Sequence, residues 1–122
     1  MSESKKDQMG TISPQDAFKF IKKHENDSNL VVLDVRPRDE FAAGHIPGAK
    51  NLDYDGHQFR KKVLNMDKDK KYIIYCKSGV RGEYFMGIMK ELGFHHVYNI
   101  LGGFVGWNIS KLPLEEGKSG GH

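Results

Sequence analysis

One short segment of the chain gathers the residues that could perform covalent chemistry. Cys76 is the only cysteine, and it follows the apolar run YIIY at residues 72–75. Lys77 and Arg81 place two positive charges within five residues of the sulfur, and a helical pattern begins directly afterwards. Cationic neighbours and a helix N-terminus both favour the thiolate form of a cysteine, which is its nucleophilic form. The segment therefore predicts a reactive sulfur that faces an anion.

Two glycines would let the backbone of this segment curl around the sulfur. Gly79 and Gly82 allow conformations and close approaches that residues with side chains resist. If residues 77–81 curl, their amide N–H groups converge on one point and can bind an oxyanion. The alternative is that Cys76 simply completes a buried strand, since free cysteines are commonly buried and inert. The glycines, the cations and the position between strand and helix favour the reactive cysteine.

The composition is that of an ordinary globular domain. At 122 residues, with 38% hydrophobic and 29% charged residues, the chain can bury a real core in one domain. The net charge of +3 is small and the charged runs mix both signs, so we expect no nucleic-acid partner. We also expect no membrane partner, because no apolar run is long enough to span a bilayer and the first ten residues have no apolar signal core. A single reduced thiol is easiest to keep in the cytosol, so the sequence predicts a cytoplasmic protein, which we take to be a monomer.

Alternating patterns predict the elements that position Cys76. Strands are expected at residues 29–35, 49–52, 70–76 and 95–101, because these runs are apolar or rich in β-branched residues. Helices are expected at residues 13–25, 37–45, 56–64 and 81–93, and a turn or helix at residues 102–112. This order predicts a parallel sheet with helices on both faces, in which ligands bind where strands end and helices begin.

Particular residues define the ends and faces of these elements. Ser13 and Pro14 are a typical cap and first residue of a helix. We expect flexible tails at residues 1–10 and 115–122, and a folded domain at residues 11–114. The buried face of the helix after the loop is predicted to consist of Tyr84, Phe85, Ile88, Met89 and Leu92.

Three segments resemble the signature motifs of the rhodanese family of sulfurtransferases. They are LDVRPRDEFAAGHIPGAKNL, YCKSGVRG and LGGFVGW, in this order within residues 11–114. The resemblance implies a three-layer α/β/α rhodanese-like domain with a central, mainly parallel five-stranded sheet. It implies that Cys76 takes a sulfane sulfur from a donor such as thiosulfate, holds it as a persulfide, and passes it to cyanide, a low-molecular-weight thiol or a protein thiol. The amides that would cradle the persulfide belong to Lys77, Ser78, Gly79, Val80 and Arg81.

The length of the loop separates two chemistries within this resemblance. Sulfur-transferring members have four residues between the cysteine and the arginine, whereas related phosphatases have five; this chain has four. The single cysteine agrees, because a reductase that resolves an oxidised thiol internally needs a second one. Sulfur transfer of this kind requires no flavin, nicotinamide or metal cofactor. One departure is Gly82, where the family often has serine, and it leaves the preferred donor open.

Two charged residues before the loop have candidate supporting roles. Asp34 ends a predicted buried strand, where an unpaired carboxylate would be destabilising. We expect it to pair with Arg36, Arg38 or Arg81 and to support the structure. Arg38 could instead line the mouth of the pocket and help bind an anion.

The alternatives belong to other functional classes. A binding or sensing module could keep the rhodanese fold without turnover, although noncatalytic relatives often lack the cysteine. A phosphatase or arsenate reductase is disfavoured by the loop length and the missing second thiol. A metal site is not expected, because the adjacent His95 and His96 point in different directions if they start a strand.

Overall fold

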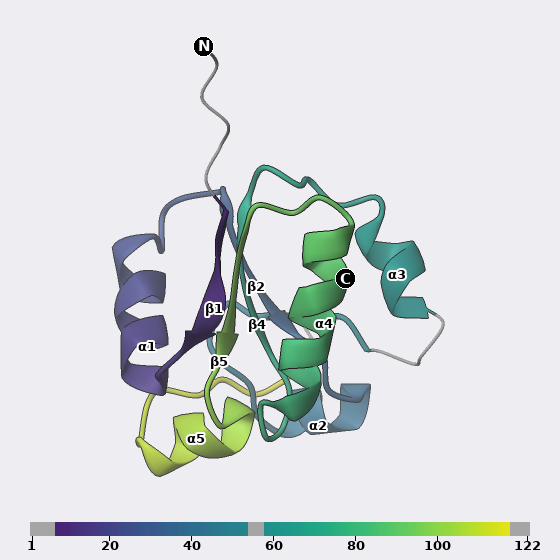
Figure 1. Ribbon diagram of the computed structural model, residues 1–122. Coiled ribbons are helices and arrows are strands. Elements are labelled where there is room, and N and C mark those ends of the chain that lie inside the picture. The colour runs from purple at the N-terminus through teal and green to yellow at the C-terminus, as the bar shows by residue number, and fades with distance from the viewer. Residues whose placement is uncertain (1–6, 54–57, 118–122) are drawn as a thin grey trace.

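Five parallel strands form the centre of the structure (Figure 1). The computed structural model describes residues 7–53 and 58–117. The strands are β1 (Gln8–Ile12), β2 (Leu30–Asp34), β3 (Lys50–Asn51), β4 (Lys71–Tyr75) and β5 (His96–Ile100). They lie in the order β1-β5-β4-β2-β3, and every neighbouring pair is parallel. The five-stranded, mainly parallel sheet that the resemblance implies is therefore confirmed.

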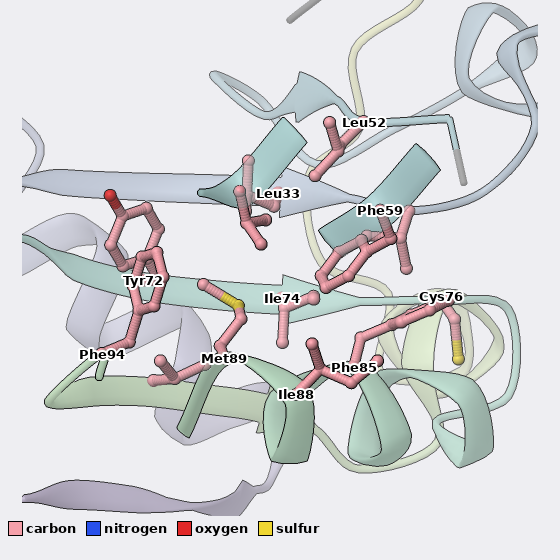
Figure 2. Packing of buried hydrophobic residues seen from close by; sticks show 13 residues of the cluster. Leu33, Leu52, Phe59, Tyr72, Ile74, Cys76, Phe85, Ile88, Met89 and Phe94 are labelled. Carbon is pink, nitrogen blue, oxygen red and sulfur yellow. The ribbon is translucent and has the colours of Figure 1, made fainter. Parts of the chain in front are cut away.

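Helices cover both faces of this sheet and complete the three predicted layers. They are α1 (Pro14–Lys23), α2 (Arg38–Ala43), α3 (Gln58–Val63), α4 (Val80–Glu91) and α5 (Gly103–Ile109). One buried cluster joins the sheet to α3 and α4, and its side chains are drawn in Figure 2. A second cluster joins the opposite face to α1, α2 and α5. None of the described helices combines the length and the apolar character needed to cross a membrane.

Burial on both faces of the sheet explains why the sequences of the central strands are continuously apolar. Leu33 on β2 and Ile74 on β4 pack toward α3 and α4, whereas the adjacent Val32 and Ile73 pack toward the other helices. Successive side chains of a strand point to opposite faces, so a strand covered on both sides needs apolar residues at every position. The apolar run that ends at Cys76 is thus a central strand of the sheet.

Local signals place the first helix as predicted. The Ser13 hydroxyl accepts a hydrogen bond from the Asp16 amide at 3.0 Å, and Pro14 is the first helical residue. The cap satisfies one of the unpaired amides at the helix start. The other predicted helices also form, although the proposed start of the third, at Gly56, lies outside the described residues.

The predicted N-terminal tail is wrong for its last three residues. Residues 8–10 belong to β1, which pairs with β5 from Gln8 opposite His96 to Ile12 opposite Ile100. This edge strand is only partly buried, so its sequence QMGTI carries no continuous apolar run. At the other end, Glu115 exchanges backbone hydrogen bonds of 2.8 Å with His45, which ties the first residue of the predicted C-terminal tail to the domain.

The predicted buried face of α4 is wrong at one position. Phe85, Ile88 and Met89 are buried, but Tyr84 is 66% exposed. The residues that face the sheet follow the spacing of three and four that begins at Phe85. Tyr84 lies one position earlier, about 100° around the helix, and therefore points toward solvent.

We predict that His96 makes the stability of the protein sensitive to acid. Burial lowers the pKa of His96, and the positive charges of Lys71 and His24 lower it further. His96 therefore binds a proton more tightly in the unfolded chain than in the folded protein. The stability that the neutral His96 side chain permits is fully present above about pH 6.5 and is lost as the pH falls. His96→Gln should therefore lose less unfolding free energy than wild type between about pH 7 and pH 5 in urea titrations. Equal losses in the two proteins would contradict the assignment.

Candidate active site

The segment around Cys76 forms a tight loop between a central strand and a helix. Cys76 directly follows β4, and α4 begins at Val80. Gly79 precedes the helix with φ of 96°, a left-handed conformation that glycine adopts without strain. The loop therefore lies at the carboxyl edge of the parallel sheet, as predicted.

The sulfur of Cys76 points at the start of α4. Its Sγ accepts a hydrogen bond from the Gly79 amide at 3.0 Å and another from the Gly82 amide at 3.3 Å. Figure 2 shows Cys76 beyond Ile74, at the end of the row of buried side chains. Two amide donors and the positive end of a helix stabilise negative charge on the sulfur. Gly82, expected only to support the loop, thus donates directly to the sulfur.

The N-terminal residues of α5 donate hydrogen bonds to the backbone of the loop. The amide of Phe104 donates to the Cys76 carbonyl at 2.8 Å, and the amide of Val105 donates to the Lys77 carbonyl at 3.0 Å. In a trans peptide the C=O and the following N–H point in opposite directions, so the amides of Lys77 and Ser78 point away from α5. The contacts to α5 therefore free these two amides for a ligand.

Gly103 makes this close approach possible. Its φ is 57°, and a Cβ atom there would lie 2.8 Å from the Gly79 amide nitrogen and still closer to the Cys76 carbonyl oxygen. From the sequence, the glycines of LGGFVGW indicate only a turn. The structure shows that this turn packs against the backbone of the candidate loop, so glycine is required at position 103.

A pocket of about 340 Å³ opens beside the sulfur. Its walls come from the loop after β4 and from the segment after β2. The lining residues are Val35, Arg36, Pro37, Glu40, Cys76, Lys77, Ser78, Val80 and Arg81. Lys77 and Arg81 are exposed cations at this pocket, which suits an anionic ligand. Glu40 adds a carboxylate that sequence reasoning missed, because nothing in its local pattern separates it from other acidic residues near a helix start.

Asp34 pairs with Arg36, one of the three arginines predicted as its partner. The Arg36 Nη2 lies 2.7 Å from Oδ2 of Asp34, and its Nε lies 3.0 Å from Oδ1. Burial lowers the pKa of Arg36, but the hydrogen bonds and charge of Asp34 outweigh this effect and raise it overall. The guanidinium also lies 3.9 Å from the centre of the Phe104 ring. Arg36 is therefore a buried structural cation in the pocket wall.

Arg38 does not line the pocket that contains Cys76. It lies at a neighbouring hollow of about 540 Å³, together with Pro37, Asp39, Ala42 and Asp53. Its amide donates to Oδ2 of Asp53 at 3.4 Å. Arg38 therefore has neither of the two roles considered for it. Asp34 pairs with Arg36, and Arg38 is not among the residues that line the described pocket beside the sulfur.

The arrangement is suited to a sulfur nucleophile and an anionic partner. The sulfur sits against two amide donors, further amides point away from α5, and two cations stand at the pocket. No group of three or more metal-ligating side chains that could hold an ion is found in residues 7–53 and 58–117.

Comparison with known proteins agrees with this geometry. Residues 18–110 match the family described as Rhodanese-like domain. The chain is 35% identical to the thiosulfate sulfurtransferase GlpE of Pseudomonas putida, and the match covers 94% of each chain. In the solved structures, a rhodanese-related protein from Thermoplasma volcanium has a TM-score of 0.73 and 27% identity, covering 86% of this chain and 96% of that one.

Relatives with a different name share the same domain. The chain is 32% identical to a tRNA uridine(34) hydroxylase of Legionella pneumophila over 86% of its own length, but it spans only 41% of that enzyme. The domain thus occurs both alone and within larger proteins. The family match, the near full-length GlpE relatives and the fold together establish that this chain belongs to the rhodanese-like family.

Proposed function

We propose that the protein is a sulfurtransferase that moves a sulfane sulfur from thiosulfate, or a related donor, to cyanide or a thiol. The observation that carries this proposal is the Cys76 sulfur itself, which accepts hydrogen bonds from Gly79 and Gly82 beside a pocket with two cations. The near full-length similarity to GlpE thiosulfate sulfurtransferases supports it. The four-residue spacing between Cys76 and Arg81 favours sulfur transfer over phosphatase chemistry.

The proposed reaction has two displacement steps at sulfur. The Cys76 thiolate attacks the outer sulfur of thiosulfate, a new S–S bond forms, and sulfite leaves with the electron pair of the broken S–S bond. Cyanide or a thiolate then attacks the outer sulfur of the persulfide and regenerates the Cys76 thiolate. Neither step needs an external oxidant or reductant, so the proposed reaction requires no redox cofactor.

The loop supplies what each step needs. The amides of Gly79 and Gly82 stabilise the thiolate, and the amides of Lys77 and Ser78 are available to the charged outer sulfur or to a donor oxygen. Lys77 and Arg81 attract the dianionic donor. Val80 adds an apolar side chain to the pocket wall.

We predict that Arg81→Ala raises the KM for thiosulfate. One charged donor is removed from the pocket, so the expected increase is about tenfold. The measurement is thiocyanate formation against thiosulfate concentration at constant cyanide. Glu40→Gln, which removes a negative charge from the same pocket, should lower the KM. Arg60→Ala is the matched control, because Arg60 is exposed on α3 and pairs with Glu91 at 2.9 Å. An unchanged KM in Arg81→Ala would mean that Arg81 serves the fold instead.

The second candidate is a rhodanese-fold module that binds or senses without turnover. This chain spans 41% of a tRNA uridine(34) hydroxylase, so a similar domain is also part of a larger protein with a different named activity. That occurrence supports the second candidate. The two functions differ in whether sulfur leaves Cys76 as well as loads onto it. Transfer to a second molecule supports the sulfurtransferase, and loading without transfer supports the module.

The proposed function also concerns the partners, the compartment and the oligomeric state of the protein. A thiosulfate-sized anion, cyanide and small thiols are the partners proposed for the pocket, and a protein thiol is a further possible acceptor for the same sulfur. Because Cys76 must stay reduced to react, we propose the cytoplasm as the working compartment. We propose a monomer as the working unit.

A further inference from the structure

Asn99 on β5 contacts the candidate loop but is not among the residues that line the pocket beside the sulfur. The side chain is 1% exposed and lies on the face of the sheet that α4 covers. Its Nδ2 donates to the Gly79 carbonyl at 3.1 Å and to the Thr11 hydroxyl at 3.3 Å. The Gly79 carbonyl also accepts the Glu83 amide at 3.2 Å, within the first turn of α4. Asn99 therefore ties the residue that donates to the Cys76 sulfur to the central sheet.

The other end of the same amide lies against Gly82. The three atoms nearest to a Cβ built on Gly82 all belong to Asn99, with Cγ at 3.0 Å and Oδ1 nearer still. Oδ1 of Asn99 is buried and has no hydrogen-bond partner among the described residues. Reversing the amide would place Oδ1 against the Gly79 carbonyl, and two acceptors cannot form a hydrogen bond. The orientation of Asn99 that allows the hydrogen bond to Gly79 therefore leaves Oδ1 buried without a partner among the described residues.

We propose that Asn99 is a positioning residue, and that Asn99 and Gly82 form a matched pair that aims both amide donors at the Cys76 sulfur. Asn99 restrains Gly79 by a hydrogen bond and contacts Gly82 directly, and these two residues supply the two described donors to Sγ. Its relevance to sulfur transfer rests on the function proposed above. The positioning itself concerns only the reactivity of Cys76.

The pair predicts a coupling between two substitutions. A methyl group at position 82 must displace Asn99, which releases the Gly79 carbonyl and shifts the Gly82 amide. Removing the Asn99 side chain creates the space that this methyl group needs. The double variant Gly82→Ala with Asn99→Ala should therefore react faster than Gly82→Ala alone, although each single change removes part of the arrangement.

Alkylation of Cys76 by iodoacetamide measures this coupling without assuming any substrate. Cys76 is the only thiol, so the rate of mass gain reports its reactivity alone. Gly82→Ala should slow alkylation by about tenfold, and Asn99→Ala by a few-fold, because a misdirected donor stabilises the thiolate less. The double variant should recover most of the loss caused by Gly82→Ala. Gly87→Ala is the matched control on the same helix, since a Cβ at Gly87 meets nothing within 4 Å, and it should react at the wild-type rate.

Thermal unfolding and sulfur loading from thiosulfate complete the test. A purely structural role would lower the melting temperature of Asn99→Ala and leave the alkylation rate of the folded protein unchanged, which would overturn the proposal. A double variant as slow as Gly82→Ala would also overturn it. If Gly82→Ala does not fold, the alkylation rate of Asn99→Ala against wild type decides by itself. A wild-type protein that alkylates rapidly but takes no sulfur from thiosulfate contradicts thiosulfate as the donor in the proposed function. The alkylation rates of the variants still test the pair of Asn99 and Gly82 in that case.

Discussion

Replacing Cys76 with serine is expected to abolish the transfer of sulfur from thiosulfate to cyanide. The rate of thiocyanate formation should fall by about 10³-fold or more, because a hydroxyl in the same place cannot form a persulfide. Cys76 is the only thiol in the chain, so no second residue can take its place. The measurement is thiocyanate formation at saturating thiosulfate.

The serine variant has to be shown to be folded. Serine is smaller than cysteine, and its oxygen can still accept the hydrogen bonds from Gly79 and Gly82. Its circular dichroism spectrum and melting temperature should therefore stay close to those of wild type. A folded Cys76→Ser protein that still forms thiocyanate would refute the assigned role of the sulfur.

Gly103→Ala is expected to cause the second largest effect, through the backbone of the loop. The added Cβ would press against the Cys76 carbonyl oxygen and lie 2.8 Å from the Gly79 amide nitrogen. We expect a loss of about 3 kcal/mol or more in unfolding free energy, because left-handed strain adds to overpacking against a backbone that cannot move aside. Sulfur loading should fall as well, since Gly79 supplies a donor to the sulfur.

Gly48→Ala is the matched control for this substitution. Gly48 also has a positive φ, 83°, but a Cβ there meets nothing within 4 Å. It should therefore show only the backbone strain, about 1–2 kcal/mol, and keep full sulfur transfer. Equal losses of stability and activity in the two variants would contradict the role given to the contact between α5 and the loop.

The parts of the fold that follow from local signals could be predicted from the sequence. The buried strands β2 and β4 were predictable because a strand covered on both faces is apolar throughout. The cap at Ser13 and the proline after it marked the start of α1. The loop at Cys76 could be assigned to a strand-to-helix boundary because a continuous apolar run ends at the cysteine, and apolar residues at helical spacing (Phe85, Ile88 and Met89) follow soon after.

The parts that depend on distant partners could not be predicted. Strand β1 is defined by its pairing with β5, nearly 90 residues later, and its own five residues carry no strand pattern. The choice of Arg36 over Arg38 as partner of Asp34 depends on side-chain direction at the strand end. The contact between Asn99 and Gly82 is likewise invisible in the sequence, because nothing in the local pattern around either residue identifies the other as its neighbour.

The most direct test of the account is the intact mass of the protein before and after incubation with thiosulfate, and again after adding cyanide. We predict a gain of one sulfur atom that disappears on addition of cyanide, with thiocyanate formed in equal amount. The reversal matters because two added oxygen atoms have nearly the same mass, and cyanide does not remove them. A protein that gains no sulfur, or whose added mass survives cyanide, would contradict a transferable persulfide on Cys76.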